Sequence, residues 1–223
     1  MPLTALVTGA NRGIGLQLVR GYAADGDSPI GTHRGGAAPQ VPGVRWETLD
    51  VTEPASQAAL AHTLAAHPID LLVCNAGLYL DGGENLAGGY PPEMWAQMFA
   101  TNVTGAFLTV QSLLPNLQLS AAPKIAIISS QMASHTRAPG RSYIYRSSKA
   151  AALNLGRNLA TDLKPLGIAV GIYHPGWVKT EMGGESAEIT AEQASAGLRA
   201  RFAALSLETT GCFETWDGHP HAY

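Results

Sequence analysis

The amino-acid sequence predicts a single doubly wound α/β domain, with a parallel sheet of about seven strands and helices on both faces. Three observations predict it. Short apolar runs alternate with longer helical patterns along the 223 residues. Several of these runs are apolar throughout, which is typical of parallel strands that are buried on both faces. A glycine-rich turn joins the first run to the first helical pattern, as in the strand–turn–helix units of this architecture.

The expected strands are the apolar runs that end in polar or glycine residues. They are 3–8, 29–33, 44–50, 69–77, 124–130, 168–176 and 211–216. The Gly- and Pro-rich segment 34–43 stands where a helix would connect the second and third strands, so this crossover is expected to be trimmed. No linker or repeat interrupts the pattern, and residues 1–223 are therefore expected to form one domain.

The expected helices are 11–26, 51–67, 91–117, 143–167 and 190–205. Thr52 is expected to cap the second helix, because a threonine hydroxyl can accept a hydrogen bond from a free N–H of the first turn. The long third helix is expected to bend near Asn102–Gly105. Pro165 and Gly167 are expected to end the fourth helix.

Composition limits the classes of protein. Hydrophobic residues make up 46% of the chain and charged residues 14%, which indicates a globular protein. The formal net charge of −3 gives no electrostatic reason to expect nucleic acid or an anionic membrane as partner. No apolar stretch reaches the length of about 18 residues that a membrane span needs. Cys74 and Cys212 match no metal-ligand spacing and suggest a reducing compartment, so a cytoplasmic protein without a metal is expected.

The first loop reads TGANRGIG and places Gly9, Gly13 and Gly15 between a strand and a helix. Glycines at such a turn let the backbone approach a pyrophosphate, while the helix N-terminus presents free N–H groups. Asn11, Arg12 and Ile14 complete the loop. Glycine turns also end strands for purely structural reasons, but the strand before and the helix after favour a dinucleotide site.

The end of the second strand favours NADP(H) over NAD(H). An acidic residue there would bind the ribose 2′-hydroxyl of NAD. This sequence has Thr32, His33 and Arg34 instead, with Arg12 in the glycine loop. Two guanidinium groups can pair with a 2′-phosphate. The alternative is that Arg34 is an ordinary solvated loop residue.

Further motifs follow in a fixed order along the chain. They are the loop at 8–15, Asp50-Val51, Asn75-Ala76-Gly77, Asn102, Ser129-Ser130, Tyr145-x-x-x-Lys149 and Pro175-Gly176. Together these motifs resemble the short-chain dehydrogenase/reductase family. The phrases YRSSKAAALN, HPGWVKTEMGG and WDG resemble its compact subgroup of carbonyl reductases similar to sniffer and the bacterial C-factor.

The resemblance implies a Rossmann fold and a role for each matching position. Asp50 and Val51 would bind the adenine, and Asn75, Ala76 and Gly77 would line the adenosine ribose. Asn102 would position a water that relays protons to Lys149. The nicotinamide end would be held by Pro175, Gly176, Val178 and Thr180.

Tyr145 and Lys149 stand four residues apart, so they share one face of a helix. Carbonyl reduction needs a proton for the oxygen, and a free tyrosine with a pKa of ~10 holds its proton too firmly. A nearby ammonium group favours the phenolate and lowers the pKa of tyrosine. The pair therefore predicts a general acid/base, Tyr145, that is tuned by Lys149. The alternative is a routine pair on a helix surface.

Ser130 is expected to donate a hydrogen bond to the substrate oxygen. Ser130 and Tyr145 are 15 residues apart, which is longer than the usual family spacing. If the usual spacing is kept, Met132 falls at the serine position, and a methionine cannot donate. We favour Ser130, because the run IISS ends a strand, and we expect the loop 134–142 to bulge outward. Arg137 and Arg141 of this loop could steer an anionic substrate or could simply be solvated.

The predicted function is an NADP-dependent oxidoreductase that acts on a small-molecule carbonyl or secondary alcohol. A cofactor-binding regulatory or signalling protein of the C-factor type is the alternative, because fold does not fix function. A sugar-nucleotide epimerase would need a larger C-terminal domain than the residues after Gly184 provide. The region 181–206 is expected to form the substrate loop and a helix. The resemblance implies a homodimer or homotetramer.

Overall fold

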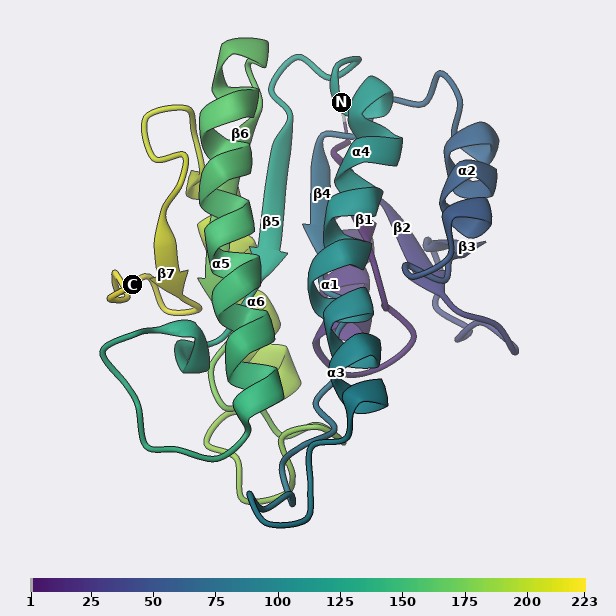
Figure 1. The fold of residues 1–223 in the computed structure, drawn as a ribbon. Coiled ribbons are helices and arrows are strands. Elements are labelled where there is room, and N and C mark those ends of the chain that lie inside the picture. Colours follow the sequence, from purple (N-terminus) through teal and green to yellow (C-terminus); the bar gives the residue numbers. More distant parts are fainter. Residues whose placement is uncertain (1) are drawn as a thin grey trace.

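The computed structural model describes residues 2–223. Its centre is a sheet of seven strands in the order β3-β2-β1-β4-β5-β6-β7, and every neighbouring pair is parallel (Figure 1). This confirms the predicted doubly wound Rossmann fold. The strands are β1 (Thr4–Val7), β2 (Ser28–His33), β3 (Arg45–Thr48), β4 (Leu71–Cys74), β5 (Lys124–Ile128), β6 (Ala169–His174) and β7 (Phe213–Thr215).

Helices cover both faces of the sheet. In Figure 1, α4 and α5 lie in front of the strands and α1 and α6 lie behind them. The helices are α1 (Gly13–Ala24), α2 (Pro54–Thr63), α3 (Pro92–Phe99), α4 (Gly105–Leu117), α5 (Tyr143–Leu163) and α6 (Ala191–Ala204). No helix within residues 2–223 combines the length and the apolar character that crossing a membrane requires.

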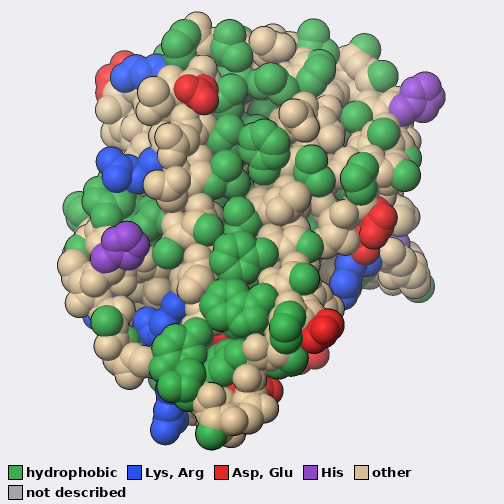
Figure 2. All heavy atoms as spheres, in the orientation of Figure 1, with side chains coloured by type: hydrophobic (Ala, Val, Ile, Leu, Met, Phe, Trp, Pro, Cys, Tyr) green, Lys and Arg blue, Asp and Glu red, His purple; other side chains and the backbone are tan. Residues whose placement is uncertain are grey.

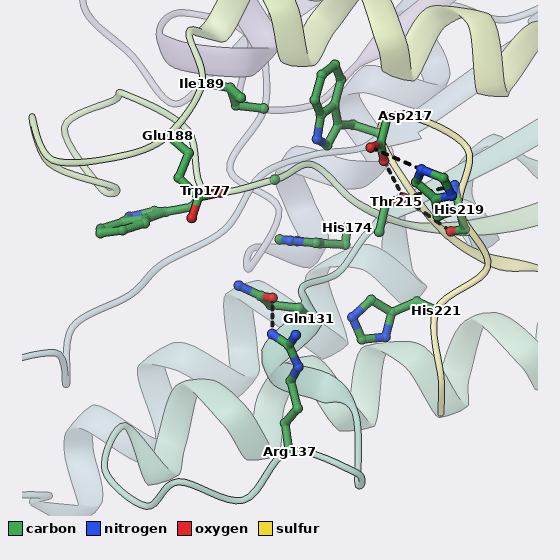
Figure 3. A pocket seen from close by; sticks show the side chains of 12 residues that line it. Gln131, Arg137, His174, Trp177, Glu188, Ile189, Thr215, Asp217, His219 and His221 are labelled. Carbon is green, nitrogen blue, oxygen red and sulfur yellow. Dashed lines mark hydrogen bonds and ion pairs between the residues drawn. The ribbon is translucent and has the colours of Figure 1, made fainter.

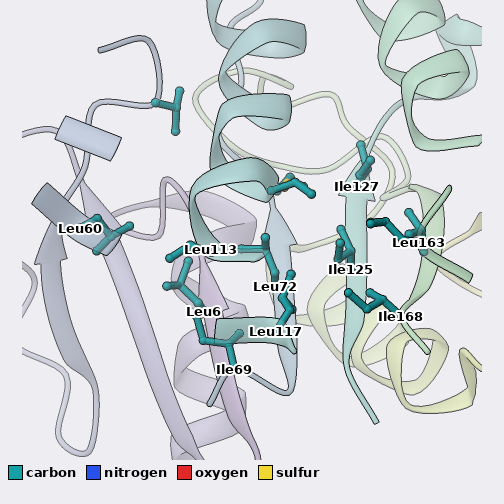
Figure 4. Packing of buried hydrophobic residues seen from close by; sticks show 14 of the residues in the cluster. Leu6, Leu60, Ile69, Leu72, Leu113, Leu117, Ile125, Ile127, Leu163 and Ile168 are labelled. Atoms are coloured by element: carbon teal, nitrogen blue, oxygen red, sulfur yellow. The ribbon is translucent and has the colours of Figure 1, made fainter. Parts of the chain in front are cut away.

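Each central strand contributes to two hydrophobic cores. In β4, Leu72 packs in the core under α4 and α5, whereas Leu71 and Val73 pack in the core under α1 and α6. Figure 4 shows the first core, in which Leu113 and Leu117 of α4 lie against strand residues such as Leu72. Successive side chains of a strand point to opposite faces, so burial on both faces requires an uninterrupted apolar run.

The helix predicted to bend near Asn102–Gly105 has a change of helix type at this position. A π-helical turn, Ala100–Thr104, separates α3 from α4. Gly105 follows it, and a Cβ on this residue would lie 2.8 Å from a methyl carbon of Val51. A π turn widens the helix by one residue, and such turns are frequent at functional sites. Here the turn carries Asn102.

Two local predictions have different outcomes. Thr52 does not cap α2, because its N–H and hydroxyl both donate to Asp50 Oδ1, at 2.9 and 2.7 Å. The helix begins instead at Pro54, which has no N–H to satisfy. At the far end of α5 the prediction is confirmed. A 3₁₀ turn containing Pro165 follows the helix, and Gly167 adopts a left-handed φ of 76°.

Candidate functional site

A groove of about 860 Å³ lies at the carboxyl ends of the strands. The strand order changes direction between β1 and β4, and ligands of open α/β sheets bind at such a switch point. The groove gathers residues from loops that are far apart in sequence. The predicted residues that line it are Gly9, Asn11, Arg12, Gly13, Ile14, Arg34, Asp50, Val51, Asn75, Ala76, Gly77, Tyr145, Lys149, Pro175 and Thr180.

The glycine loop is packed closely against the loop after β4. Gly9 has a φ of 62°, and a Cβ there would lie 3.0 Å from Ala76 Cα. Asn75 Nδ2 donates to the carbonyl oxygens of Thr8 at 2.9 Å and Gly9 at 3.2 Å. A Cβ on Gly15 would lie 2.6 Å from that same amide nitrogen. The loop therefore needs glycine at positions 9 and 15 for its own packing.

The N-terminus of α1 opens toward the groove. Its N-cap residue, Arg12, has an extended backbone and makes no side-chain capping bond. Gly13 begins the helix with a φ of 56° and lines the groove. Unpartnered N–H groups at a helix start attract phosphate oxygens. The cradle of glycine backbone and helix start therefore fits the pyrophosphate of a dinucleotide.

The end of the groove that is predicted to hold the adenosine ribose is polar. Asp50 accepts two hydrogen bonds from Thr52, and the pKa of its carboxyl is lowered mainly by the backbone N–H of that residue. Arg34 lines the groove nearby, and its positive charge also lowers the pKa of Asp50. Arg12 is paired with Glu181. His33 is not part of the lining, because its ring is buried with its edge toward the ring of Trp46, at a centroid distance of 6.2 Å.

Tyr145 and Lys149 are both buried, at 8% and 5% exposure, which excludes the alternative of a surface pair. Lys149 Nζ lies 5.6 Å from the centroid of the Tyr145 ring and donates to the carbonyl oxygen of Ile128 at 2.9 Å. Burial raises the pKa of Tyr145 and lowers the pKa of Lys149 to about 8. Both residues line the groove, so a charged ligand bound there would lie close enough to change their pKa values.

Ser130, rather than Met132, provides the hydroxyl beside Tyr145. A side-chain hydrogen bond with Ser130 opposes the effect of burial and lowers the pKa of Tyr145. Ser130 Oγ also accepts from Met132 N at 3.1 Å and so caps the 3₁₀ turn Gln131–Ala133. The Met132 side chain packs with Met98 in the apolar cluster around Tyr145. Within the predicted loop 134–142, residues 135–141 are exposed, as expected for an outward bulge, whereas Ser134 and Ser142 at its ends are buried.

Asn102 connects three segments without lining the groove. Its Oδ1 accepts from Leu78 N at 2.8 Å, and its Nδ2 donates to Leu78 O and Ser148 Oγ, both at 2.9 Å. A Cβ on Gly77 would lie 3.5 Å from Asn102 Oδ1 and 3.6 Å from Lys149 Nζ. The π turn thus brings Asn102 to the loop after β4 and to the helix of Lys149.

The predicted nicotinamide end divides between two cavities. Pro175 and Thr180 line the groove, whereas Gly176 lines a second cavity beside it. Val178 is buried against Ala191 of α6 and lines neither cavity. Nowhere in the described part of the chain do three His, Cys, Asp or Glu side chains converge as a metal ion needs.

Sequence reasoning missed Asp81, which is fully buried and shapes the start of α5. Its Oδ2 accepts from the backbone N–H groups of Ile144 at 2.8 Å and Tyr145 at 3.3 Å. The N-cap residue, Ser142, has a left-handed φ of 47° and makes no capping bond with its side chain. The Tyr79 hydroxyl lies 2.8 Å from Ser142 Oγ, and its ring centroid lies 4.4 Å from that of Tyr145. No local spacing relates residues 81 and 144, so no sequence signal could have found this contact.

The fold and the groove define an α/β protein with the architecture of a dinucleotide-binding domain. A family model described as short chain dehydrogenase matches residues 3–190, and the chain belongs to that family. It is 33% identical over 161 residues to the C-signal of Myxococcus xanthus, covering 72% of this chain and 96% of that protein.

Two further comparisons extend over nearly the whole chain. The sequence is 33% identical over 225 residues to 1-hydroxy-2-glutathionyl-2-methyl-3-butene dehydrogenase of Rhodococcus sp. strain AD45, covering 96% of this chain and 97% of that one. The fold matches that of an NADPH-bound carbonyl reductase from chicken fatty liver, with a TM-score of 0.91, 29% identity and full coverage of both chains. The resemblance to the carbonyl reductase subgroup is thereby confirmed.

Proposed function

We propose that this protein is an NADP-dependent oxidoreductase that transfers a hydride between the cofactor and a small carbonyl or secondary alcohol. One observation carries the proposal. A phenol and an amine, Tyr145 and Lys149, are buried side by side at the edge of a groove built for a dinucleotide. Burial alone raises the pKa of the phenol, so proton exchange at neutral pH requires a positive charge beside it.

Each residue has a defined task in the proposed mechanism. When bound, the nicotinamide cofactor supplies the hydride. Tyr145 gives its phenolic proton to the substrate oxygen, and Ser130 donates a hydrogen bond to that oxygen as negative charge develops. Lys149 stabilises the phenolate through its charge. Asn102 positions a water that returns a proton toward Lys149. The hydrogen bonds of the Asn102 side chain to Leu78 and Ser148 support this role, because they hold the segments around the water in place.

We assign NADP rather than NAD on the chemistry of the ribose end. Arg34 lines the groove just after β2, where NAD would call for a carboxylate. Arg34 can pair with a 2′-phosphate, and the pairing of Arg12 with Glu181 leaves Arg34 as the main contributor. The similar carbonyl reductase from chicken fatty liver has NADPH bound, which agrees with this choice.

The proposed substrate side includes the region 181–206. Met182 and Glu192 of this region line the groove. Met182 is 45% exposed, so this wall of the groove stays open to solvent. An open wall suits a catalyst that accepts several small carbonyl compounds.

We also propose a homo-oligomer that works in the cytoplasm. Figure 2 shows hydrophobic side chains running along the face that α4 and α5 form. Phe107 of α4 is 39% exposed and Tyr143 of α5 is 40% exposed. Two copies that joined through this face would bury such side chains. Sedimentation of the purified protein tests the assembly, with Phe107→Glu as the variant expected to disrupt it.

The two cysteines, Cys74 and Cys212, bear on the proposed location. Both are free thiols, as a reducing compartment favours.

The test of the enzymatic function is Tyr145→Phe. Turnover of a panel of carbonyl compounds with NADPH should fall by at least about a thousandfold. This loss lies within the range of rate enhancements that general acid catalysis provides. NADPH affinity, measured by fluorescence, should stay within about twofold of the wild type. A variant that retains full activity would refute the role of Tyr145.

A second function is favoured by one specific observation. The chain is similar to the C-signal over 96% of that protein's length, which supports a cofactor-binding signalling protein with little turnover. Tight NADPH binding without oxidation of NADPH by any carbonyl of the panel would favour this alternative. Turnover that disappears in Tyr145→Phe would exclude it.

A further inference from the structure

A second cavity, of about 430 Å³, adjoins the groove at the turn after β6. Pro175 lines the groove, while its chain neighbours His174 and Gly176 line the second cavity. Gln131, which directly follows Ser130, lines it as well. The volume lies in the range of small-molecule sites. The cavity therefore starts beside the residues that are proposed to act on the carbonyl.

The cavity has an apolar wall and a polar wall. Trp177, Trp216 and Ile189 form the apolar wall. Trp177 is 44% exposed, and its Nε1 donates to Gly183 O at 2.9 Å, so its polar edge is already engaged. Figure 3 shows the His174 ring between this wall and the pair Gln131 and Arg137. A ligand with an apolar segment and a hydrogen-bonding end would match both walls.

His174 is the residue of this cavity that lacks a partner. The side chain is 8% exposed, and its Nδ1 is buried with no hydrogen bond among the described residues. Burial, together with His221 and Arg137, lowers the pKa of His174 to about 4, so the ring is neutral near pH 7. A buried polar atom without a partner costs about 1–3 kcal/mol. The Nδ1 atom itself is closed to solvent, but the His174 residue lines the cavity, so a bound ligand would lie against its ring.

Arg137 supplies the positive charge of the cavity lining, whereas Asp217 and Glu188 line it with carboxylates. Asp217 lies 3.7 Å from His219 Nε2 and accepts from Thr215 Oγ1, and this hydrogen bond lowers the pKa of its carboxyl. Glu188 is exposed at the side of Trp177. Arg137 donates to Gln131 Oε1 and keeps further N–H groups of its planar fork available. A carboxylate is the group that such a fork binds best.

We infer that this cavity receives the end of the substrate that lies away from the carbonyl, and that this end carries a carboxylate held by Arg137 and His174. The substrate class is then a keto acid, or the corresponding hydroxy acid, with an apolar segment between its two functional groups. This inference rests on the proposed function, because the carbonyl must lie at Tyr145.

The kinetic test compares straight-chain keto acids with their methyl esters. Two, four or six methylenes separate the ketone from the carboxylate, so the best length reports the distance between the cavity and Tyr145. The ratio of kcat/KM for acid over ester should exceed one at the best length. It should fall about tenfold in Arg137→Gln, the value of one charge-assisted hydrogen bond. Arg141→Gln is the matched control on the same exposed loop and should leave the ratio unchanged.

A binding test separates the cavity from the chemistry. Heptanoate has no ketone and cannot react, and its binding can be followed through tryptophan fluorescence because Trp177 and Trp216 line the cavity. The signal should persist in Tyr145→Phe and become smaller in Trp177→Phe, in which Trp216 remains as the reporter. Heptanoate should bind several-fold more weakly to His174→Phe, which keeps a ring and removes the unpartnered nitrogen.

The outcomes distinguish the two proposals. Heptanoate binding without turnover of any carbonyl supports the cavity and refutes the proposed enzyme. Turnover with an acid-to-ester ratio at or below one for every length, or the same ratio in Arg137→Gln and Arg141→Gln, overturns the inference and leaves the enzyme intact.

Discussion

Asp81 holds the backbone of Tyr145 from a distance of 64 residues along the chain. Its carboxylate accepts from the N–H groups of Ile144 and Tyr145, at 2.8 and 3.3 Å, in the first turn of α5. The contact replaces the capping bond that the Ser142 side chain does not make. A negative charge is also favourable at a helix N-terminus. The loop after β4 thus fixes where the proposed acid begins its helix.

Removal of this capping group should weaken the fold. Asp81→Ala leaves two buried N–H groups without a partner, so the free energy of unfolding should fall by about 1–3 kcal/mol. Asp81→Asn keeps an acceptor oxygen and should lose less. Urea denaturation measures both, and Asp162→Asn, at an exposed position of the same helix, is the control. Equal stability of Asp81→Ala and Asp162→Asn would contradict the capping role.

Lys149 should make stability depend on pH in alkaline solution. Burial lowers its pKa from 10.5 to about 8, so between these values the unfolded chain holds a proton that the folded chain has released. The free energy of unfolding should therefore rise with pH in that window. Tyr145 acts oppositely above its ordinary pKa of 10.0, because burial raises its pKa and the folded chain then keeps the proton. Cys74 also acts oppositely from its ordinary pKa of 9.0 upward, because burial raises its pKa. The expected rise thus lies between about pH 8 and 9.

Lys149→Met should remove this rise. The measurement is urea unfolding at several pH values without cofactor, and Lys164→Met, at an exposed position after α5, provides the comparison. If the positive slope between pH 8 and 9 survives in Lys149→Met, another group causes it.

Gly15→Ala should damage the glycine loop through Asn75. The added methyl would lie 2.6 Å from Asn75 Nδ2 and 2.7 Å from Gly9 O, so either the loop or the asparagine must move. NADPH affinity should fall at least about tenfold, because the pyrophosphate cradle depends on this packing. Gly83→Ala is the matched control, since a Cβ there meets nothing within 4 Å. Wild-type affinity in Gly15→Ala would show that the loop tolerates the shift.

Arg34→Gln should change cofactor preference. Loss of a guanidinium–phosphate contact should raise the KM for NADPH by about tenfold or more and leave the KM for NADH almost unchanged. Arg12→Gln should have a smaller effect, because Arg12 is paired with Glu181. Steady-state kinetics of both variants with NADPH and with NADH measure these effects. Equal losses for NADPH and NADH would mean that Arg34 does not recognise the 2′-phosphate.

The strands could be predicted because burial on both faces leaves a direct mark in the sequence. Leu71, Leu72 and Val73 are consecutive apolar residues whose side chains alternate between the two cores. The cap of α2 was predicted wrongly, because Asp50 competes for Thr52 and the proline at position 54 already satisfies the helix start. Such competition between local hydrogen bonds depends on the path of the chain, which a sequence pattern does not contain.

The same distinction between local and distant relations holds for the candidate site. Tyr145 and Lys149 could be paired from sequence because one turn of helix separates them, and the glycine loop could be placed because it lies between a strand and a helix. The relation of Asn102 to Leu78 and Ser148, and of Asp81 to the start of α5, joins segments that no spacing connects.

The sequence by itself determined the order of strands and helices, the glycine loop and the Tyr145–Lys149 pair, because periodicity and short-range spacing are properties of neighbouring residues. Only the tertiary structure decided that Ser130 stands beside Tyr145, that Gly176 faces a second cavity, and that His174 and Arg137 both line this cavity. These relations arise where loops from separate strands meet at one edge of the sheet, so they exist only after the sheet has formed.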